Sequence, residues 1–176
     1  MATTNGSTAV LTRPEPVKLD PLDGKFSIDL PSERALRAYW DVDIIGYEDQ
    51  KHRVIEANDP FTVLFRLQLA GSLWSCMRVD WWFDLGFAPI GAGKNFDLSD
   101  LVGKDRFWVK GWNGCESGRD ITLPIEVPRN TIPTEYCGTV YTCTGRVQGY
   151  CCGKTAGLSG FEPIGQFDFT QPVIED

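Results

Sequence analysis

The side chains best suited to metal binding or nucleophilic catalysis are six cysteines and a single histidine, His52. The cysteines are Cys76, Cys115, Cys137, Cys143, Cys151 and Cys152. No two of them have the C-x-x-C spacing typical of zinc sites, and a catalytic cysteine would have only His52 as its base. We therefore predict no metal site, no cofactor and no catalytic cysteine. The thiols are then either small buried apolar side chains or disulfide partners.

Two carboxylates, Asp80 and Asp84, share one face of an alternating segment, with Trp82 between them. A glycosidase needs two carboxylates on opposite sides of a cleft, and residues four apart on one flat strand do not provide that geometry. We therefore predict that the protein is not an enzyme. Acidic side chains beside an aromatic ring also resemble a sugar-binding surface, so a carbohydrate-binding module is the alternative function.

Aromatic residues are frequent in this sequence, with six Trp, ten Phe and five Tyr. Phe107, Trp108 and Trp112 surround Gly111 in a glycine-rich segment, where large apolar side chains are uncommon. Aromatic side chains bury much area at a small entropic cost, which is typical of protein contact surfaces. We predict that these three aromatic residues and Trp82 form a contact surface for a protein partner, most simply another copy of the chain. The expected function is that of a non-catalytic structural or interaction protein.

The charge balance is acidic, with 17 Lys and Arg against 24 Asp and Glu and a net charge of −7. The densest basic stretch, residues 51–53, is too short to neutralise a row of phosphates, so we expect no nucleic-acid or anionic-membrane partner. No run of about 18 apolar residues occurs, and we expect a soluble protein without membrane insertion. The N-terminus lacks the basic start and apolar core of a secretory signal. This favours an intracellular protein, although six cysteines leave an oxidising compartment open.

Alternation of apolar and polar residues predicts two β-strands, at residues 61–69 and 76–85. Phe65 and Trp81 lie at the centres of their apolar faces, and we expect both side chains to be almost fully buried. Replacing either by Ala should cost about 3–5 kcal/mol. The two strands are either antiparallel neighbours or a crossover between two sheets, and their apolar faces require a second layer.

Further strands are expected over residues 39–47, 53–57, 121–127, 136–147 and 161–169. Residues 86–113 are rich in loop signals, residues 149–160 indicate a turn, and residues 32–37 are the helix candidate. Pro124 has no amide donor, which predicts that its strand lies at a sheet edge. About seven short strands with regular turn signals favour an all-β fold, an antiparallel two-sheet β-sandwich.

The tripeptide Tyr141-Thr142-Cys143 resembles the Tyr-x-Cys of the penultimate strand of immunoglobulin-type domains, and Trp81 resembles their core tryptophan. The segment 61–69 has no cysteine to pair with Cys143. The resemblance therefore implies an immunoglobulin-like architecture and not membership of that family, and architecture alone carries no function.

The chain divides into two parts. Residues 1–24 contain three prolines and no apolar period, which predicts a flexible N-terminal tail that can serve as an arm toward a neighbouring subunit. Residues 25–176 are expected to form a single β-sandwich domain.

Overall fold

The computed structural model describes residues 25–26, 37–46, 53–70, 78–104, 107–111, 118–135 and 137–171, and these residues are mainly β-strand. The strands are β1 (Lys25–Phe26), β2 (Arg37–Ile45), β3 (Val54–Glu56), β4 (Phe61–Ala70), β5 (Asp80–Pro89), β6 (Phe96–Asp97), β7 (Phe107–Val109), β8 (Gly118–Val127), β9 (Thr139–Cys151) and β10 (Lys154–Thr170). One short helix, α1 (Leu98–Val102), occurs in the described part of the chain. The prediction of an all-β fold is confirmed at this level.

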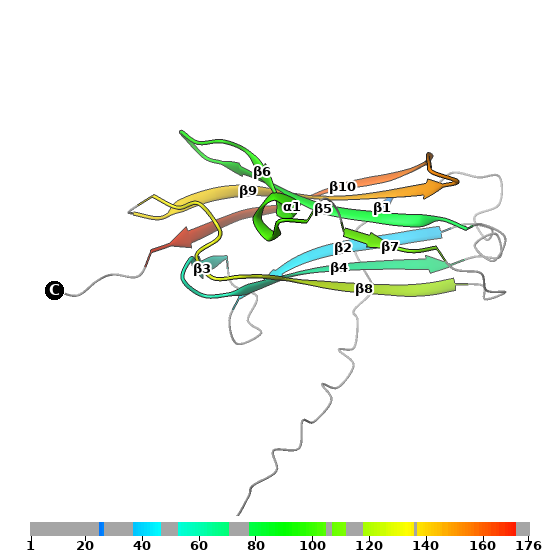
Figure 1. Ribbon diagram of the computed structural model, residues 1–176, viewed down its shortest axis with the longest axis horizontal. Coiled ribbons are helices and arrows are strands. Elements are labelled where there is room, and N and C mark those ends of the chain that lie inside the picture. Colours follow the sequence, from blue (N-terminus) through cyan, green and yellow to red (C-terminus); the bar gives the residue numbers. More distant parts are fainter. Residues whose placement is uncertain are drawn as a thin grey trace, which may run out of the picture.

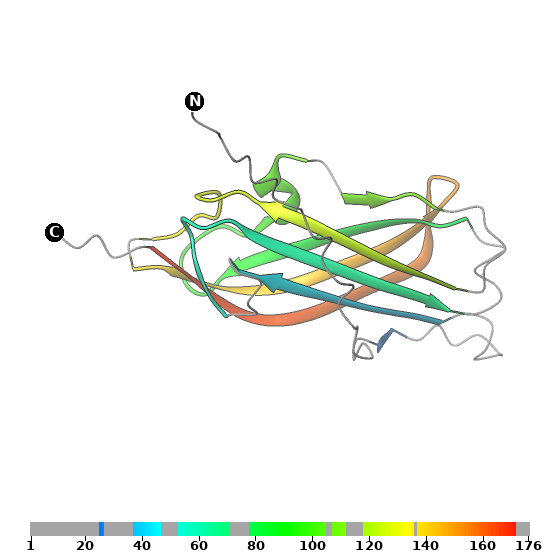
Figure 2. The same cartoon turned by 90° about the horizontal axis from the view of Figure 1, so that it is seen from below.

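The strands form two sheets, which lie one above the other in two layers (Figure 1). One sheet has the order β1-β2-β4-β8, and the other has the order β3-β10-β9-β5-β6, with β7 also paired to β5. All of these pairings are antiparallel except that of β3 with β10, which is parallel. Figure 2 shows the strands of the two layers crossing obliquely. The link from β4 to β5 is therefore a crossover between sheets, which resolves the alternative that the sequence left open.

The core lies between the two layers, because each long strand turns its apolar face inward. Phe65 on β4 is 0% exposed and Trp81 on β5 is 2% exposed, so the predicted burial of both side chains is confirmed. Phe65 meets Phe83 of the opposite sheet, with ring centroids 5.5 Å apart. Burying one such side chain stabilises the fold by about 1.5–3 kcal/mol.

A turn lies within the predicted segment 149–160, but it is much shorter than predicted, because β9 and β10 continue to a two-residue turn at Cys152 and Gly153. Both turn residues have positive φ, 54° and 75°, as hairpin turns that match the strand twist require. Gly149 and Gly160 lie inside the strands, where they permit close packing. A Cβ on Gly160 would lie 2.6 Å from Nε1 of Trp40.

The loop-rich segment 86–113 also contains more structure than predicted. β5 continues to Pro89, and β6, α1 and β7 follow it. The backbone N–H of Asp97 donates to Asp100 Oδ2 at 3.0 Å at the start of α1, and Gly103 ends the helix with φ 65°.

Three other expectations concern the edges and termini. Pro124 lies on β8, which is the last strand of its sheet in the described part of the chain, as predicted for an edge position. Of the helix candidate at 32–37, only Arg37 is described, and it begins β2. The predicted tail, residues 1–24, lies outside the described residues.

Candidate binding surface

Aromatic side chains gather on the outer face of the six-stranded sheet. Trp82 points outward from β5, because its neighbours Trp81 and Phe83 face the core. Trp108 on β7 lies directly opposite Trp82 in the strand register. Its side chain is 38% exposed. The structure thus brings together two of the predicted contact residues.

The other two predicted contact residues do not join them. Phe107 is only 4% exposed, because it pairs with Phe83 and shares its inward direction. Trp112 lies outside the described residues.

Two further aromatic residues on this face were missed by the sequence analysis. Tyr150 on β9 packs edge-on against Trp108, with ring centroids 5.0 Å apart. Phe161 on β10 is 70% exposed and lies opposite Arg146, which also faces outward. The outward direction of Tyr150 follows from alternation along β9, which the predicted turn at 149–160 interrupted. Phe161 begins the predicted strand 161–169, and its exposure depends on which face of that strand turns outward. We call Trp82, Trp108, Tyr150 and Phe161 the aromatic face.

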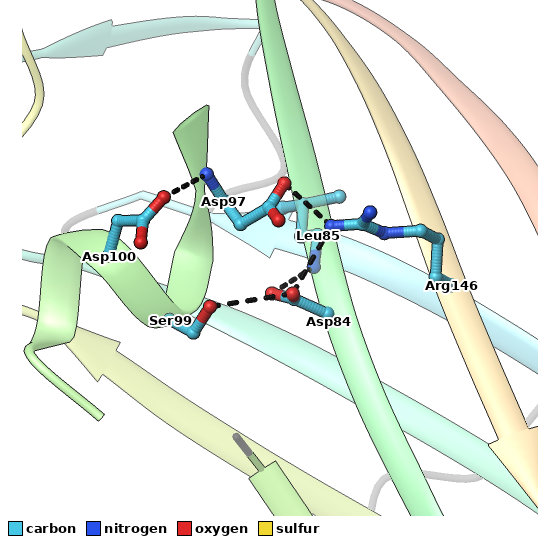
Figure 3. Close-up of polar contacts among 6 residues, drawn as sticks. All are labelled: Asp84, Leu85, Asp97, Ser99, Asp100 and Arg146. Atoms are coloured by element: carbon cyan, nitrogen blue, oxygen red, sulfur yellow. Dashed lines mark hydrogen bonds and ion pairs between the residues drawn. The ribbon is translucent and has the colours of Figure 1, made fainter. Parts of the chain in front are cut away.

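An ion cluster lies beside the aromatic face (Figure 3). Arg146 on β9 bridges two carboxylates, with 3.1 Å from Nη2 to Asp84 Oδ2 and 2.6 Å to Asp97 Oδ1. The Ser99 hydroxyl of α1 donates to Asp84 Oδ2 at 3.5 Å. The Arg146 guanidinium also lies 5.8 Å from the centroid of the Trp82 ring, a distance that permits a cation–π interaction. The cluster therefore joins four elements, β5, β6, β9 and α1, across the sheet surface.

Asp84 is the most buried member of this cluster, at 2% exposed. Desolvation by burial raises the pKa of the Asp84 carboxyl, while the backbone N–H of Leu85 and the charge of Arg146 oppose the rise. Leu85 N–H donates to Asp84 Oδ1 at 2.9 Å. The carboxylate is thus held by a cation and an amide, as a structural ion pair would be.

The second carboxylate of the sequence pattern, Asp80, is held in a similar way. Its Oδ1 accepts the backbone N–H of Gly111 at 2.5 Å, and its Oδ2 lies 3.6 Å from the Lys110 ammonium. Lys110 in turn lies 5.9 Å from the centroid of the Trp108 ring. The carboxylates of Asp80 and Asp84 therefore both make contacts that stabilise the strands carrying the aromatic face.

Two open pockets border this region. The smaller, about 320 Å³, lies over β5 and β9 between Arg146 and Phe161, where Gly86 and Ala88 leave room. The larger, about 660 Å³, lies near the start of β9 and is lined by Tyr141 among others. Volumes of this size suit a side chain of a partner or a small ligand.

A separate charged cluster lies on the opposite edge, where β2 meets β10. The Arg66 guanidinium pairs with Asp41 and Asp43, the latter at 2.7 Å. Glu162 on β10 is close to this group, and its buried Oε2 has no hydrogen-bond partner among the described residues. Burial, and then the negative charges of Asp41 and Asp43, raise the pKa of Glu162 to about 7. The region where β2 meets β10 therefore contains a carboxyl group, that of Glu162, with a pKa near neutrality.

Within the described ranges, no group of three or more His, Cys, Asp or Glu side chains could hold a metal ion. No helix in the same part of the chain is long and apolar enough to cross a membrane.

No protein-family model and no curated protein matches this chain. Among solved structures, the chain is similar to one described as "X-ray structure of Northeast Structural Genomics Consortium target SoR45". The match has 10% identity, covers 80% of this chain and 90% of the other, and has a TM-score of 0.26. A likeness at this level carries no argument about fold or function.

Proposed function

We propose that this protein is a non-catalytic interaction module that associates with a second copy of itself through the aromatic face. One observation carries the proposal, namely the collection of large aromatic side chains on one sheet surface, with Phe161 70% exposed and Trp108 38% exposed. Exposed aromatic side chains that lie together are enriched at protein contact surfaces, because they bury much area with few rotatable bonds. Phe107 is left out of this surface because it is buried.

Charge favours a second copy as the partner. Two identical chains that pair about a twofold axis must each present a self-complementary surface. Arg146 and Lys110 lie on this face together with Asp80 and Asp97, so both signs of charge are available. A face of mixed charge allows close approach of two chains whose net charge is −7.

We further propose that the two layers are an immunoglobulin-like sandwich. The long strands β2, β4 and β8 share one sheet and β5, β9 and β10 the other, as strands A, B, E and C, F, G do in such domains. With β3 they make about seven strands. No strand in the described residues corresponds to strand D.

Two side chains support the same architecture. The Tyr141 hydroxyl donates to the backbone carbonyl of Pro133, which is the contact of a tyrosine corner. Trp81 is buried on the strand that corresponds to C. Cys143 is a buried free thiol without the disulfide of antibody domains.

The test combines light scattering with two matched variants. The wild-type chain is expected to be dimeric at micromolar concentration by size-exclusion chromatography with light scattering. The double variant Trp108→Ser/Phe161→Ser should dissociate at least about 30-fold more readily, the effect of losing a hot spot worth about 2 kcal/mol. The control is Leu64→Ser, a half-buried residue on the outer face of the other sheet, which should leave the dimer intact.

Circular dichroism must show that both variants remain folded. A wild-type chain that is monomeric at all concentrations would overturn the proposal. If assembly is absent and a glycan array detects binding that the double variant loses, the same aromatic face belongs to a carbohydrate-binding module.

A further inference from the structure

The most exposed ring of the aromatic face lies directly beside a hollow in the same surface. Phe161 on β10 is 70% exposed, and it borders the smaller pocket, of about 320 Å³. Small side chains on the outer surface of β5 and β9 also line this pocket, namely Gly86, Ala88, Thr142 and Thr144. We call it the β5–β9 pocket. One face of the protein therefore carries a projecting ring and a hollow next to each other.

A projecting ring beside a hollow is what a self-complementary surface requires. When two identical chains pair about a twofold axis, the ring of each copy can meet the hollow of the other, and the two contacts are equivalent. A ring that is 70% exposed would hold two flat faces apart, whereas a pocket that accepts the ring lets the faces close. A volume of about 320 Å³ is at the lower end of the range for small-ligand pockets and is large enough for one phenyl ring.

The charged side chains of the pocket suit an aromatic occupant better than an ion. Arg146 Nη2 lies 2.6 Å from Asp97 Oδ1 and 3.1 Å from Asp84 Oδ2, so the guanidinium charge is already compensated (Figure 3). The same guanidinium lies 5.8 Å from the centroid of the Trp82 ring. Because a guanidinium can stack on aromatic rings with either face, its other side can accept a second ring. The pocket therefore offers an incoming ring a planar cation as well as small apolar side chains.

The area that a stable dimer buries is larger than the exposed rings alone provide. A stable protein contact covers about 800 Å² on each chain, and one buried aromatic side chain contributes about 150–250 Å². Phe161 and Trp108 together therefore supply at most about 500 Å². The surface around them must also be covered, and the β5–β9 pocket is the part of that surface next to Phe161.

The backbone edge of β10 is a less suitable contact than the face. Over residues 159–163 β10 pairs with β9, and its other edge has no strand partner in the described part of the chain. Pro163 has no amide donor for such a partner. Glu162 lies opposite Gly145, which faces the core, so its charged side chain also turns inward. Proteins use both features to block pairing at a sheet edge, so we expect the second copy on the face.

We propose that two copies of the chain pair about a twofold axis that passes between Phe161 and the β5–β9 pocket, so that Phe161 of each copy occupies the pocket of the other. This inference rests on the proposed self-association and adds which residue of one copy meets which hollow of the second.

The test is a complementation between two variants. Phe161→Ser removes the ring and leaves the pocket, whereas Ala88→Phe fills the pocket and leaves the ring. Each variant alone should dissociate at least about tenfold more readily than wild type in light scattering. In an equimolar mixture, the heterodimer keeps one contact, that of Phe161 in the Ala88→Phe chain with the open pocket of the Phe161→Ser chain. Native mass spectrometry should therefore find the heterodimer above the share expected for random pairing.

The control is Thr122→Phe, which adds the same ring at an exposed position on β8 of the other sheet and should leave the dimer intact. Circular dichroism must show that each variant is folded. If Ala88→Phe unfolds, Thr144→Phe fills the same pocket from β9 and replaces it in the mixture.

Two results would overturn this pairing while the aromatic face remains the contact surface. One is a dimer whose association is unchanged by the folded pocket-filling variant. The other is a mixture in which the heterodimer does not exceed the random share although both single variants associate more weakly. A wild-type chain that is monomeric at all concentrations instead overturns the self-association itself, so the two failures are distinguishable.

Discussion

At the scale of single residues, Glu162 makes stability depend on pH. Its folded-state pKa, about 7, lies above the ordinary 4.5, because burial and the charges of Asp41 and Asp43 disfavour the carboxylate. Below the lower value both states are protonated. As the pH rises from 4.5 to 7 the unfolded chain releases its proton first, so the folded state loses stability through this window and no more above it.

We therefore expect Glu162→Gln to be more stable than wild type at pH 8 and to lose that advantage toward pH 5. Melting temperatures of both proteins across this range provide the measurement, and all other titrating groups are common to both. A constant difference between the two curves would mean that Glu162 does not titrate in the window.

Arg146 supports a second prediction at this scale. It is the cation that compensates Asp84, which is 2% exposed. Arg146→Met should destabilise the fold by about 3 kcal/mol, because it leaves a buried carboxyl without its cation. Urea denaturation measures the loss. The double variant Asp84→Asn/Arg146→Met should lose less unfolding free energy than the single variant Arg146→Met. An equal or larger loss in the double variant would contradict the role given to the ion pair.

At the scale of elements, glycines control how closely β10 can approach β2. A Cβ at position 160 would lie within 2.6 Å of the Trp40 indole, which is itself 2% exposed and cannot move aside. Gly160→Ala should therefore cost about 1–3 kcal/mol, the usual range for overpacking. Ser159→Ala, at the exposed neighbouring position, is the control and should change stability by no more than about 0.5 kcal/mol. Equal unfolding midpoints for the two variants would contradict the close packing.

The same glycines explain which elements could be predicted from the sequence. Alternating faces around Phe65 and Trp81 identified β4, β5 and the core, because burial of a sheet face imposes a period of two. Gly149 and Gly160 were interpreted as turn residues, since a sequence does not distinguish a glycine that permits positive φ from one that permits close contact. The helix α1 was missed because a single turn has no apolar period.

The candidate site was predictable only in part, for a similar reason. Trp82 and Trp108 could be selected by residue type, but Phe107 has the same type and faces inward. Its direction depends on the register of β7 against β5, which is a long-range property. Tyr150 required the true extent of β9, and Phe161 required the face of its strand that turns outward.

At the scale of the whole molecule, the tail and the assembly give the remaining prediction. Residues 1–24 have no periodic apolar face, so deleting them should leave the melting temperature of the remaining chain nearly unchanged at low protein concentration. At high protein concentration the melting temperature of the full-length chain should rise, because association stabilises the folded state by mass action. Differential scanning fluorimetry over a hundredfold range of concentration tests both statements. A large loss of stability on truncation would show that the tail contributes a core strand.

The parallel pairing of β3 with β10 has a consequence for folding during synthesis. Val54 pairs with Asp168, Ile55 with Phe169 and Glu56 with Thr170, so residues more than a hundred positions apart must meet. During translation β3 leaves the ribosome long before β10 does, and its partner edge does not yet exist. Contacts of such separation close slowly, and the unfinished sheet leaves the backbone edge of β9 unpaired until β10 is added. Nascent chains that stop before residue 154 should therefore be the ones that recruit chaperones.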